Sequence, residues 1–178
     1  MGWLELLFGV GRGADLLDRS QTEIDHEAAR LARNARDETV STAALANHHD
    51  RSRMPLVVYL DEDERPQFVF RGSVLLVSDA DDELARNYPT REIQVVITDR
   101  RIIFVIGNKR SDDVLEVAFE NVHDVYLDEE SWRRYLVVDA KNDGDPMTFF
   151  ADLTLESRFE NLKRAVEYLA TQPDDDDS

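Results

Sequence analysis

The feature that most constrains this chain is the stretch IQVVITDRRIIFVI at residues 93–106. Two apolar runs rich in Val, Ile and Phe lie on either side of the polar break Thr98, Asp99, Arg100 and Arg101, and such runs favour β-strands. A short polar break between two strands predicts an antiparallel hairpin. Because each run is nearly continuous in apolar residues, we expect both faces of these strands to be covered at least in part, as in a packed β-sandwich or a closed roll.

The charge balance is strongly acidic, with 38 Asp and Glu residues against 21 Lys and Arg residues and a net charge of −17. Only Lys109, Lys141 and Lys163 are lysines. This combination is typical of proteins from salt-loving archaea or bacteria, because molar salt screens repulsion between carboxylates. We therefore expect a halophilic protein; the alternative is an ordinary acidic protein of a mesophile.

The chain has no cysteine, which excludes disulfides, thiolate chemistry and Cys-based zinc sites. No apolar run approaches the roughly 20 residues that a membrane span needs. The N-terminus lacks the basic region of a signal peptide. We therefore expect a cytoplasmic protein, with peripheral contact to a membrane as the alternative.

The N-terminal part differs from the rest of the chain. Four large apolar residues fall at helical spacing at its start: Trp3, Leu4, Leu7 and Phe8. Glycines 9, 11 and 13 then interrupt this stripe. Residues 21–53 are polar, Ala-rich and free of Gly and Pro, and small apolar residues recur at Ile24, Ala28, Leu31 and Ala35. The pattern predicts a helix that frays after Thr39 and needs a partner surface to stay folded.

After Met54 and Pro55 the chain changes to short β-like runs separated by acidic turns. The runs are 67–70, 73–77, 93–98, 101–106, 114–119, 122–127, 135–139 and 147–151. The dipeptide Asp143-Gly144 predicts a hairpin turn between the last two runs, since glycine tolerates a positive φ.

An amphipathic helix closes the chain. Its apolar seam is Leu155, Phe159, Leu162, Val166 and Leu169, with Asp152 and Thr154 as candidate N-caps and Glu160 and Arg164 as an i, i+4 ion pair. The seam needs an apolar surface, and the sheet is the only large one. The sequence therefore predicts an α+β fold: an antiparallel β roll or sandwich of about seven strands, capped by a C-terminal helix and preceded by a helical extension.

The segments 54–72, 95–107 and 114–127 resemble the bacterial and archaeal pleckstrin-homology-like domains, close to the YokE-like group. The residues that carry the resemblance are Glu64, Thr98, Arg100, Arg101, Phe104, Phe119, Val122 and Val125. The resemblance implies a pleckstrin-homology-like domain over residues 54–171, after an N-terminal helical extension at 1–53 and before an acidic disordered tail at 172–178. It implies a fold, and oligomer formation through sheet edges or the closing helix, but no ligand.

Most chemical sites are disfavoured by the sequence. Arg100 and Arg101, like the other basic pairs, are diluted by acidic neighbours, so we interpret them as turn arginines in local ion pairs and not as a phosphoinositide site. The glycines at 9–13 do not follow a strand, and the adjacent His48 and His49 diverge on a helix, so neither a phosphate loop nor a metal site is expected. The acidic run at 61–64 lacks the spacing of a calcium loop. We find no catalytic constellation and expect no cofactor, and the charge disfavours nucleic acid.

The sequence thus favours a non-enzymatic interaction module that acts by protein–protein association or self-assembly. The predicted interaction residues are Trp3, Leu4, Leu7, Phe8, Arg100 and Arg101, the last two on an exposed hairpin. The apolar stripe at the N-terminus has three interpretations: it is an interfacial membrane anchor, it is a helix that docks on a partner or a second copy, or it packs on the protein's own sheet. An enzyme of unrecognised type is the competing class, and a deep pocket lined by acids would support it.

Overall fold

The computed structural model of the chain describes residues 19–47, 54–79, 84–88, 92–107, 112–130, 132–142, 144–154 and 159–172. The predicted stripe of Trp3, Leu4, Leu7 and Phe8 lies outside the described residues, as do His48, His49 and the acidic residues that end the sequence. Of the helices described, none combines the length and apolar character that a membrane span requires.

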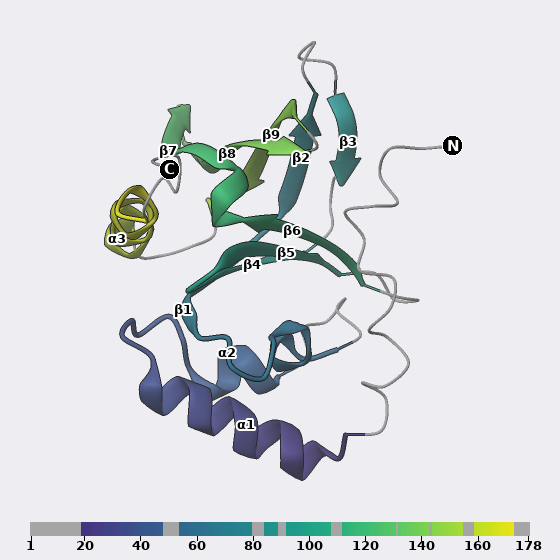
Figure 1. Cartoon of the computed structure of the whole chain (residues 1–178), viewed down its shortest axis with the longest axis vertical. Helices are drawn as coiled ribbons and strands as arrows, with labels where there is room; N and C mark the ends of the chain where they lie inside the picture. The colour runs from purple at the N-terminus through teal and green to yellow at the C-terminus, as the bar shows by residue number, and fades with distance from the viewer. Residues whose placement is uncertain are drawn as a thin grey trace.

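Nine strands in the described part of the chain form two antiparallel sheets that pack face to face (Figure 1). The four-stranded sheet has the order β1 (Pro66–Gly72), β4 (Ile93–Thr98), β5 (Arg101–Ile106) and β6 (Asp113–Ala118). The five-stranded sheet has the order β3 (Leu84–Tyr88), β2 (Val74–Ser78), β9 (Asp145–Asp152), β8 (Arg133–Asn142) and β7 (Val122–Glu130). The predicted α+β sandwich is therefore confirmed.

Both predicted hairpins are present. β4 pairs with β5 in antiparallel register from Ile93 opposite Ile106 to Ile97 opposite Ile102. β8 pairs with β9 across a turn in which Gly144 has a φ of 92°, a conformation that glycine tolerates best. β3 is absent from the predicted strands, because its sequence LARNY is short and lacks a clear β pattern.

The two sheets are joined at a corner where β1 runs into β2 with only Ser73 between them. Gly72 lies at this corner, and a Cβ there would be 2.3 Å from the carbonyl oxygen of Asp152. The Ser73 N–H donates to the same oxygen at 3.1 Å. Only glycine lets the two backbones approach so closely, so this residue fixes how the sheets meet.

Helix α3 (Phe159–Ala170) closes the sandwich and packs beside β7 (Figure 1). Leu162 and Leu169 of the predicted seam are buried in the core between the sheets, as is Ala165, and Phe159 and Val166 pack against it. The remaining seam residue, Leu155, lies outside the described residues. The ring of Tyr168 lies 5.7 Å from that of Phe68, and its hydroxyl donates to the carbonyl oxygen of Thr98 at 3.2 Å. The C-terminal helix is thus anchored to the β4–β5 turn as well as to the core.

The structure contradicts the predicted N-cap at Asp152 and the predicted ion pair between Glu160 and Arg164. Asp152 belongs to β9 and is not an N-cap; it accepts the N–H of Thr154, whose hydroxyl oxygen accepts the N–H of Arg134, so both residues fasten β9 to β8. The N-cap prediction for Thr154 falls on residues 155–158, which lie outside the described residues. Arg164 does not pair with Glu160 but with Asp37, at 2.7 Å. The partner of Arg164 thus comes from a distant segment of the chain and not from its own helix.

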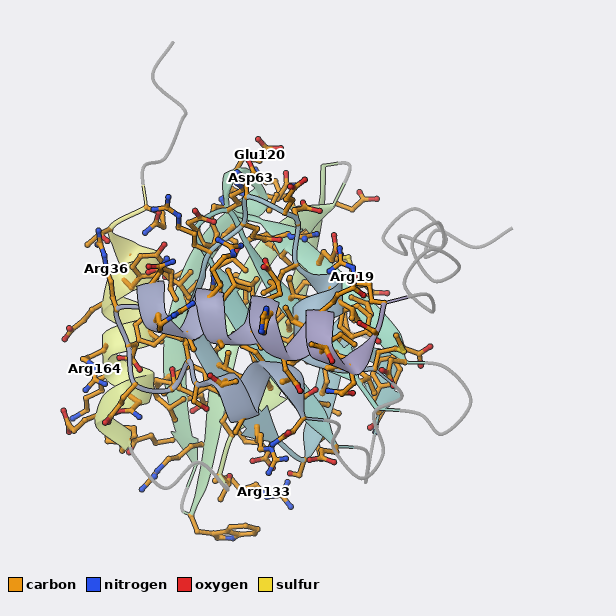
Figure 2. The ribbon with its side chains drawn as sticks, turned by 90° about the horizontal axis from the view of Figure 1, so that it is seen from below. Arg19, Arg36, Asp63, Glu120, Arg133 and Arg164 are labelled. Atoms are coloured by element: carbon orange, nitrogen blue, oxygen red, sulfur yellow. The ribbon has the colours of Figure 1, made fainter. Side chains whose placement is uncertain are left out.

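A second core lies on the outer face of the four-stranded sheet. Helix α1 (Gln21–Asn34), helix α2 (Thr42–Ala46) and the 3-10 turn η2 (Leu56–Tyr59) cover this face (Figures 1 and 2), and Ile24, Ala28 and Leu31 of α1 are buried there. Both faces of β4 and β5 are therefore covered, as predicted, and every residue of β4 is buried. The N-terminal helices supply the second cover, which explains the continuous apolar runs.

The N-terminal helix is shorter than predicted. It starts at a capping box in which Ser20 and Glu23 bind each other's backbone N–H groups, and it ends at Asn34. The carboxylate of Asp37 then accepts the N–H of Thr39 at 2.9 Å and the guanidinium of Arg164. These contacts stabilise a turn where the helix was expected to continue.

Candidate interaction surface

The turn between β4 and β5 is built by Thr98. Its hydroxyl oxygen accepts the N–H groups of Arg100 and Arg101, at 3.1 and 3.0 Å, and donates to the carbonyl oxygen of Arg101. Asp99 extends this order to the next segment, since its carboxylate accepts the N–H of Arg65 at 3.0 Å. The turn is therefore held by its own polar groups and by the chain that leads into β1.

The Arg101 side chain is only 12% exposed and lies in a network of carboxylates. It donates two hydrogen bonds to Glu64, at 2.8 and 2.6 Å, in a bidentate pair, and it also pairs with Glu116. Its remaining contacts are the carbonyl oxygen of Tyr59 at 3.2 Å and Asp61 at 3.6 Å. The network ties η2 and the loop after it to the four-stranded sheet.

The pKa values of Glu64 and Arg101 are shifted in opposite directions by their hydrogen bonds and ion pairs. Burial alone would raise the pKa of Glu64, but the hydrogen bonds from Arg101 and from the backbone of Asp61 lower it below the ordinary value. Burial would likewise lower the pKa of Arg101, and the carboxylates of Glu64, Glu116 and Asp61 raise it instead. Both groups are therefore held in their charged forms.

Arg100 is half-exposed and pairs with Asp63 at 2.6 Å. Both arginines are engaged in ion pairs, as interpreted from the sequence, but the partners are not local, because Asp63 and Glu64 lie 37 residues earlier in the chain. The prediction of an exposed hairpin holds for Arg100 and is wrong for Arg101, because a buried Glu64 lies 37 residues earlier in the chain and binds it. The structure brings Arg100 and Arg101 to one turn but does not describe the four apolar residues predicted to act with them.

A different surface emerges on the outer face of the five-stranded sheet. Residues in register across four strands form one apolar row, which we call the outer row: Leu76 of β2, Phe150 of β9, Val137 of β8 and Tyr126 of β7. The alternate residues of these strands point into the core, which places the outer row on the opposite face. None of α1, α2 and α3 covers this face, since all three pack elsewhere.

The outer row is partly open to solvent. Tyr126 is 41% exposed, Leu76 and Phe150 are half-buried, and Val137 between them is buried. Large apolar side chains that stay accessible in an ordered sheet are typical of surfaces that bind another molecule. Sequence reasoning missed the row because it depends on which strands are neighbours. The alternation within VHDVYLDEE is the one signal that could have placed Tyr126 on an outer face.

Carboxylates surround the exposed end of the outer row. Asp124 and Asp128 lie on the same face of β7 on either side of Tyr126, and Asp139 lies across from Asp124 on β8. Burial raises the pKa of Tyr126, and the negative charges of Asp139, Asp128 and Asp124 raise it further. The tyrosine ring therefore sits in a negative potential.

The tip between β7 and β8 adds a second exposed aromatic residue. Trp132 is 71% exposed, and the guanidinium of Arg133 lies 4.9 Å from the centre of its ring. Arg133 also donates to the hydroxyl of Tyr135 at 2.9 Å, and Tyr135 lies on the same face as the outer row. Figure 2 shows Arg133 at the opposite end of the view from Asp63, the partner of Arg100. The tip that carries Arg133 and the partner of Arg100 are thus at different ends of the molecule.

Other candidate sites offer little room or chemistry. In the part of the chain that is described, no three metal-ligating side chains gather at one point. A hollow of about 30 Å³ lies beside β6 and the β8–β9 hairpin, lined in part by Glu116, Lys141 and Met147, and it has room for about one water molecule. His26 and His123 are exposed.

No family model and no curated protein sequence matches the chain. Among solved structures, it is similar to the pleckstrin homology (PH) domain of USP37, with a TM-score of 0.36 and 9% identity. The similarity covers 57% of this chain and 92% of that one. These comparisons assign the chain to no family, and the surface is therefore defined by its own residues.

Proposed function

We propose that this chain is a non-enzymatic interaction module that binds a protein partner through the outer face of its five-stranded sheet. The observation that carries the proposal is the outer row, which crosses four strands and leaves Tyr126 accessible at its end. Tyrosine and tryptophan supply large contact areas at a small cost in conformational entropy, so they are enriched where proteins bind one another. Tyr126 and Trp132 are the large apolar side chains that stay exposed among the described residues.

The negative charge of this face favours a protein over an anionic membrane. Asp124, Asp128 and Asp139 would face the headgroups if the outer row met a bilayer, and anionic lipids would repel them. A second copy of the chain is a possible protein partner, since self-assembly would use the same apolar row.

The N-terminal stripe remains part of the proposal as a second contact. Trp3, Leu4, Leu7 and Phe8 would dock on a partner protein or a second copy. Deletion of residues 1–13 tests this: loss of molar mass in sedimentation supports assembly, loss of liposome flotation supports a membrane anchor, and unfolding supports packing on the protein's own sheet.

Site-specific photo-crosslinking tests the proposed surface. A photo-reactive phenylalanine analogue replaces Tyr126 in the full chain, and the matched control carries it in place of Glu120, which is exposed at the end of the molecule away from Arg133 (Figure 2). We expect discrete protein adducts from position 126 that disappear when Phe150 is also changed to Ser. Equal labelling at both positions, or adducts with lipid alone, would contradict the proposal.

A further inference from the structure

The outer faces of the two sheets are covered differently. α1, α2 and η2 together cover the outer face of the four-stranded sheet, with α2 and η2 between α1 and the strands, and Ile24, Ala28 and Leu31 of α1 are buried in the core that they form (Figure 1). The five-stranded sheet carries an apolar row at the corresponding place without a helix from the described residues. Within the described part of the chain, helices therefore complete the outer face of one sheet and not that of the other.

The dimensions of the outer row suit a helix. Neighbouring strands lie about 4.8 Å apart, so the distance from Leu76 to Tyr126 across four strands is roughly 14 Å. An α-helix rises about 1.5 Å per residue and covers that distance in about ten residues, with apolar side chains at i, i+3, i+4 and i+7. Such a helix is shorter than α1, which has 14 residues.

The charges beside the row define the polar edge of such a helix. Asp124 and Asp128 flank Tyr126 on β7, and Asp139 lies beside them on β8, where it accepts a hydrogen bond from Thr148 at 2.7 Å. Lys141 lies further along β8, beyond Asp139. Arg133, at the tip between β7 and β8, lies over the ring of Trp132 and donates a hydrogen bond to the hydroxyl of Tyr135. The potential at the exposed end of the row is therefore negative.

We propose that the occupant of the outer row is a basic amphipathic helix of a partner protein, with its apolar side chains on Leu76, Phe150 and Tyr126 and its Lys or Arg side chains beside Asp124, Asp128 and Asp139. The inference rests on the proposed function and names the chemistry of the partner. A second copy of this chain fits less well, because stacking two such faces brings like charges together. The N-terminal stripe fits less well too, because it carries Glu5 and no basic residue among its first eleven.

Two peptides of about 15 residues, a length at which isolated helices become stable, provide the probe. Both carry Leu at i, i+3, i+4 and i+7; one carries Arg at the flanking positions, and its twin carries Glu there. Binding to the full chain is measured by calorimetry in dilute buffer and again in 1 M KCl. We expect the Arg peptide to bind, its twin not to bind, and the affinity to fall with salt.

Variants of the face locate the binding. We expect Tyr126→Ser, and separately the pair Asp124→Asn with Asp128→Asn, to weaken binding of the Arg peptide by about tenfold. The matched control pair Glu120→Gln with Asp145→Asn removes the same charge from exposed positions off the face and should change the affinity by less than about twofold. If Tyr126→Ser lowers the folded fraction, the aspartate pair still decides the outcome, because both substitutions are isosteric.

Each other outcome overturns a stated part of the account. If the aspartate pair and the control pair change the peptide affinity equally, the Arg peptide is attracted by the net charge of the chain and not by this face. Equal binding of both peptides, lost in Tyr126→Ser, would refute the basic partner and leave the proposed function intact. A concentration-dependent doubling of mass that Tyr126→Ser abolishes would replace the basic helix by a second copy. A rise of more than about tenfold in peptide affinity after deletion of residues 1–13 would identify the N-terminal stripe as the occupant. No effect of Tyr126→Ser on any binding or on mass would refute the proposed function itself.

Discussion

The bidentate pair between Glu64 and Arg101 offers the sharpest test of how this fold is stabilised. The Glu64 side chain is fully buried, and its two oxygens accept from Arg101 and from the N–H of Asp61. Glu64→Gln keeps the shape of the side chain and removes its charge. Arg101 then stays buried with one strong carboxylate partner, Glu116, and a weaker one, Asp61.

The expected loss is about 3 kcal/mol in the free energy of unfolding. Breaking a buried ion pair by removing one partner costs about 3–5 kcal/mol, and the low end applies because Arg101 retains other carboxylates. For a chain of this length, about 1 kcal/mol lowers the melting temperature by about 2–4 °C, so Glu64→Gln should lower it by roughly 6–12 °C. Calorimetry at neutral pH measures both quantities, and Glu62→Gln, on the exposed neighbour, is the matched control with a shift below about 2 °C.

The pH dependence gives a second readout of the same pair. Because the folded-state pKa of Glu64 is lowered from its ordinary value of 4.5, its stabilising contribution is complete above that value and is lost as the pH falls through the folded-state pKa. The stability gap between the wild-type chain and Glu64→Gln should therefore narrow in acid and stay constant between pH 6 and 8. Equal stability of the two chains at neutral pH, or a gap that widens in acid, would refute the assigned role of the pair.

Four further predictions follow from the fold and the composition. Gly72→Ala should lower the free energy of unfolding by about 1–3 kcal/mol in denaturant titration, because its Cβ meets the backbone oxygen of Asp152; an unchanged midpoint would show that the corner is not tight. Gln94→Met should raise the melting temperature by a few degrees, because the buried amide of Gln94 has no hydrogen-bond partner; a fall would indicate a role for that amide. Molar KCl should raise the melting temperature relative to dilute buffer through screening of the net charge of −17, and a flat or falling curve would contradict halophily. A chain that begins at Met54 should bind hydrophobic dyes and aggregate, because it exposes the second core; a soluble monomer would instead show that residues 54–171 fold alone.

Local patterns predicted the elements of this fold well where they were strong. The runs at 93–106 gave β4 and β5 with both faces covered, and Asp143-Gly144 gave the turn between β8 and β9. The seam of α3 was found because Leu162 and Leu169 recur at helical spacing. The weak pattern of β3 and the early end of α1 were missed. β3 needs β2 as its pairing partner. The turn after α1 is held in part by a contact between Asp37 and Arg164, which lie 127 residues apart.

The candidate surface could not be predicted, because it depends on strand order. Leu76, Phe150, Val137 and Tyr126 become one row only when β2 lies beside β9 and β9 beside β8, and no local pattern specifies those neighbours. For Arg101 the prediction was wrong in the opposite sense, because it placed a buried side chain at the surface. Its position in a polar turn suggested exposure, and the partner that buries it comes from the loop before β1.

The central claim is that the outer face of the five-stranded sheet is the binding surface. The most direct measurement is a map of backbone amide shifts in the isotope-labelled full chain on titration with the Arg peptide, or with a protein identified by crosslinking at position 126. The account predicts that the largest changes fall on Leu76, Tyr126, Val137 and Phe150, with little change in α1. Changes centred on the turn at Arg100 and Arg101, or on α1 and α2, would contradict it.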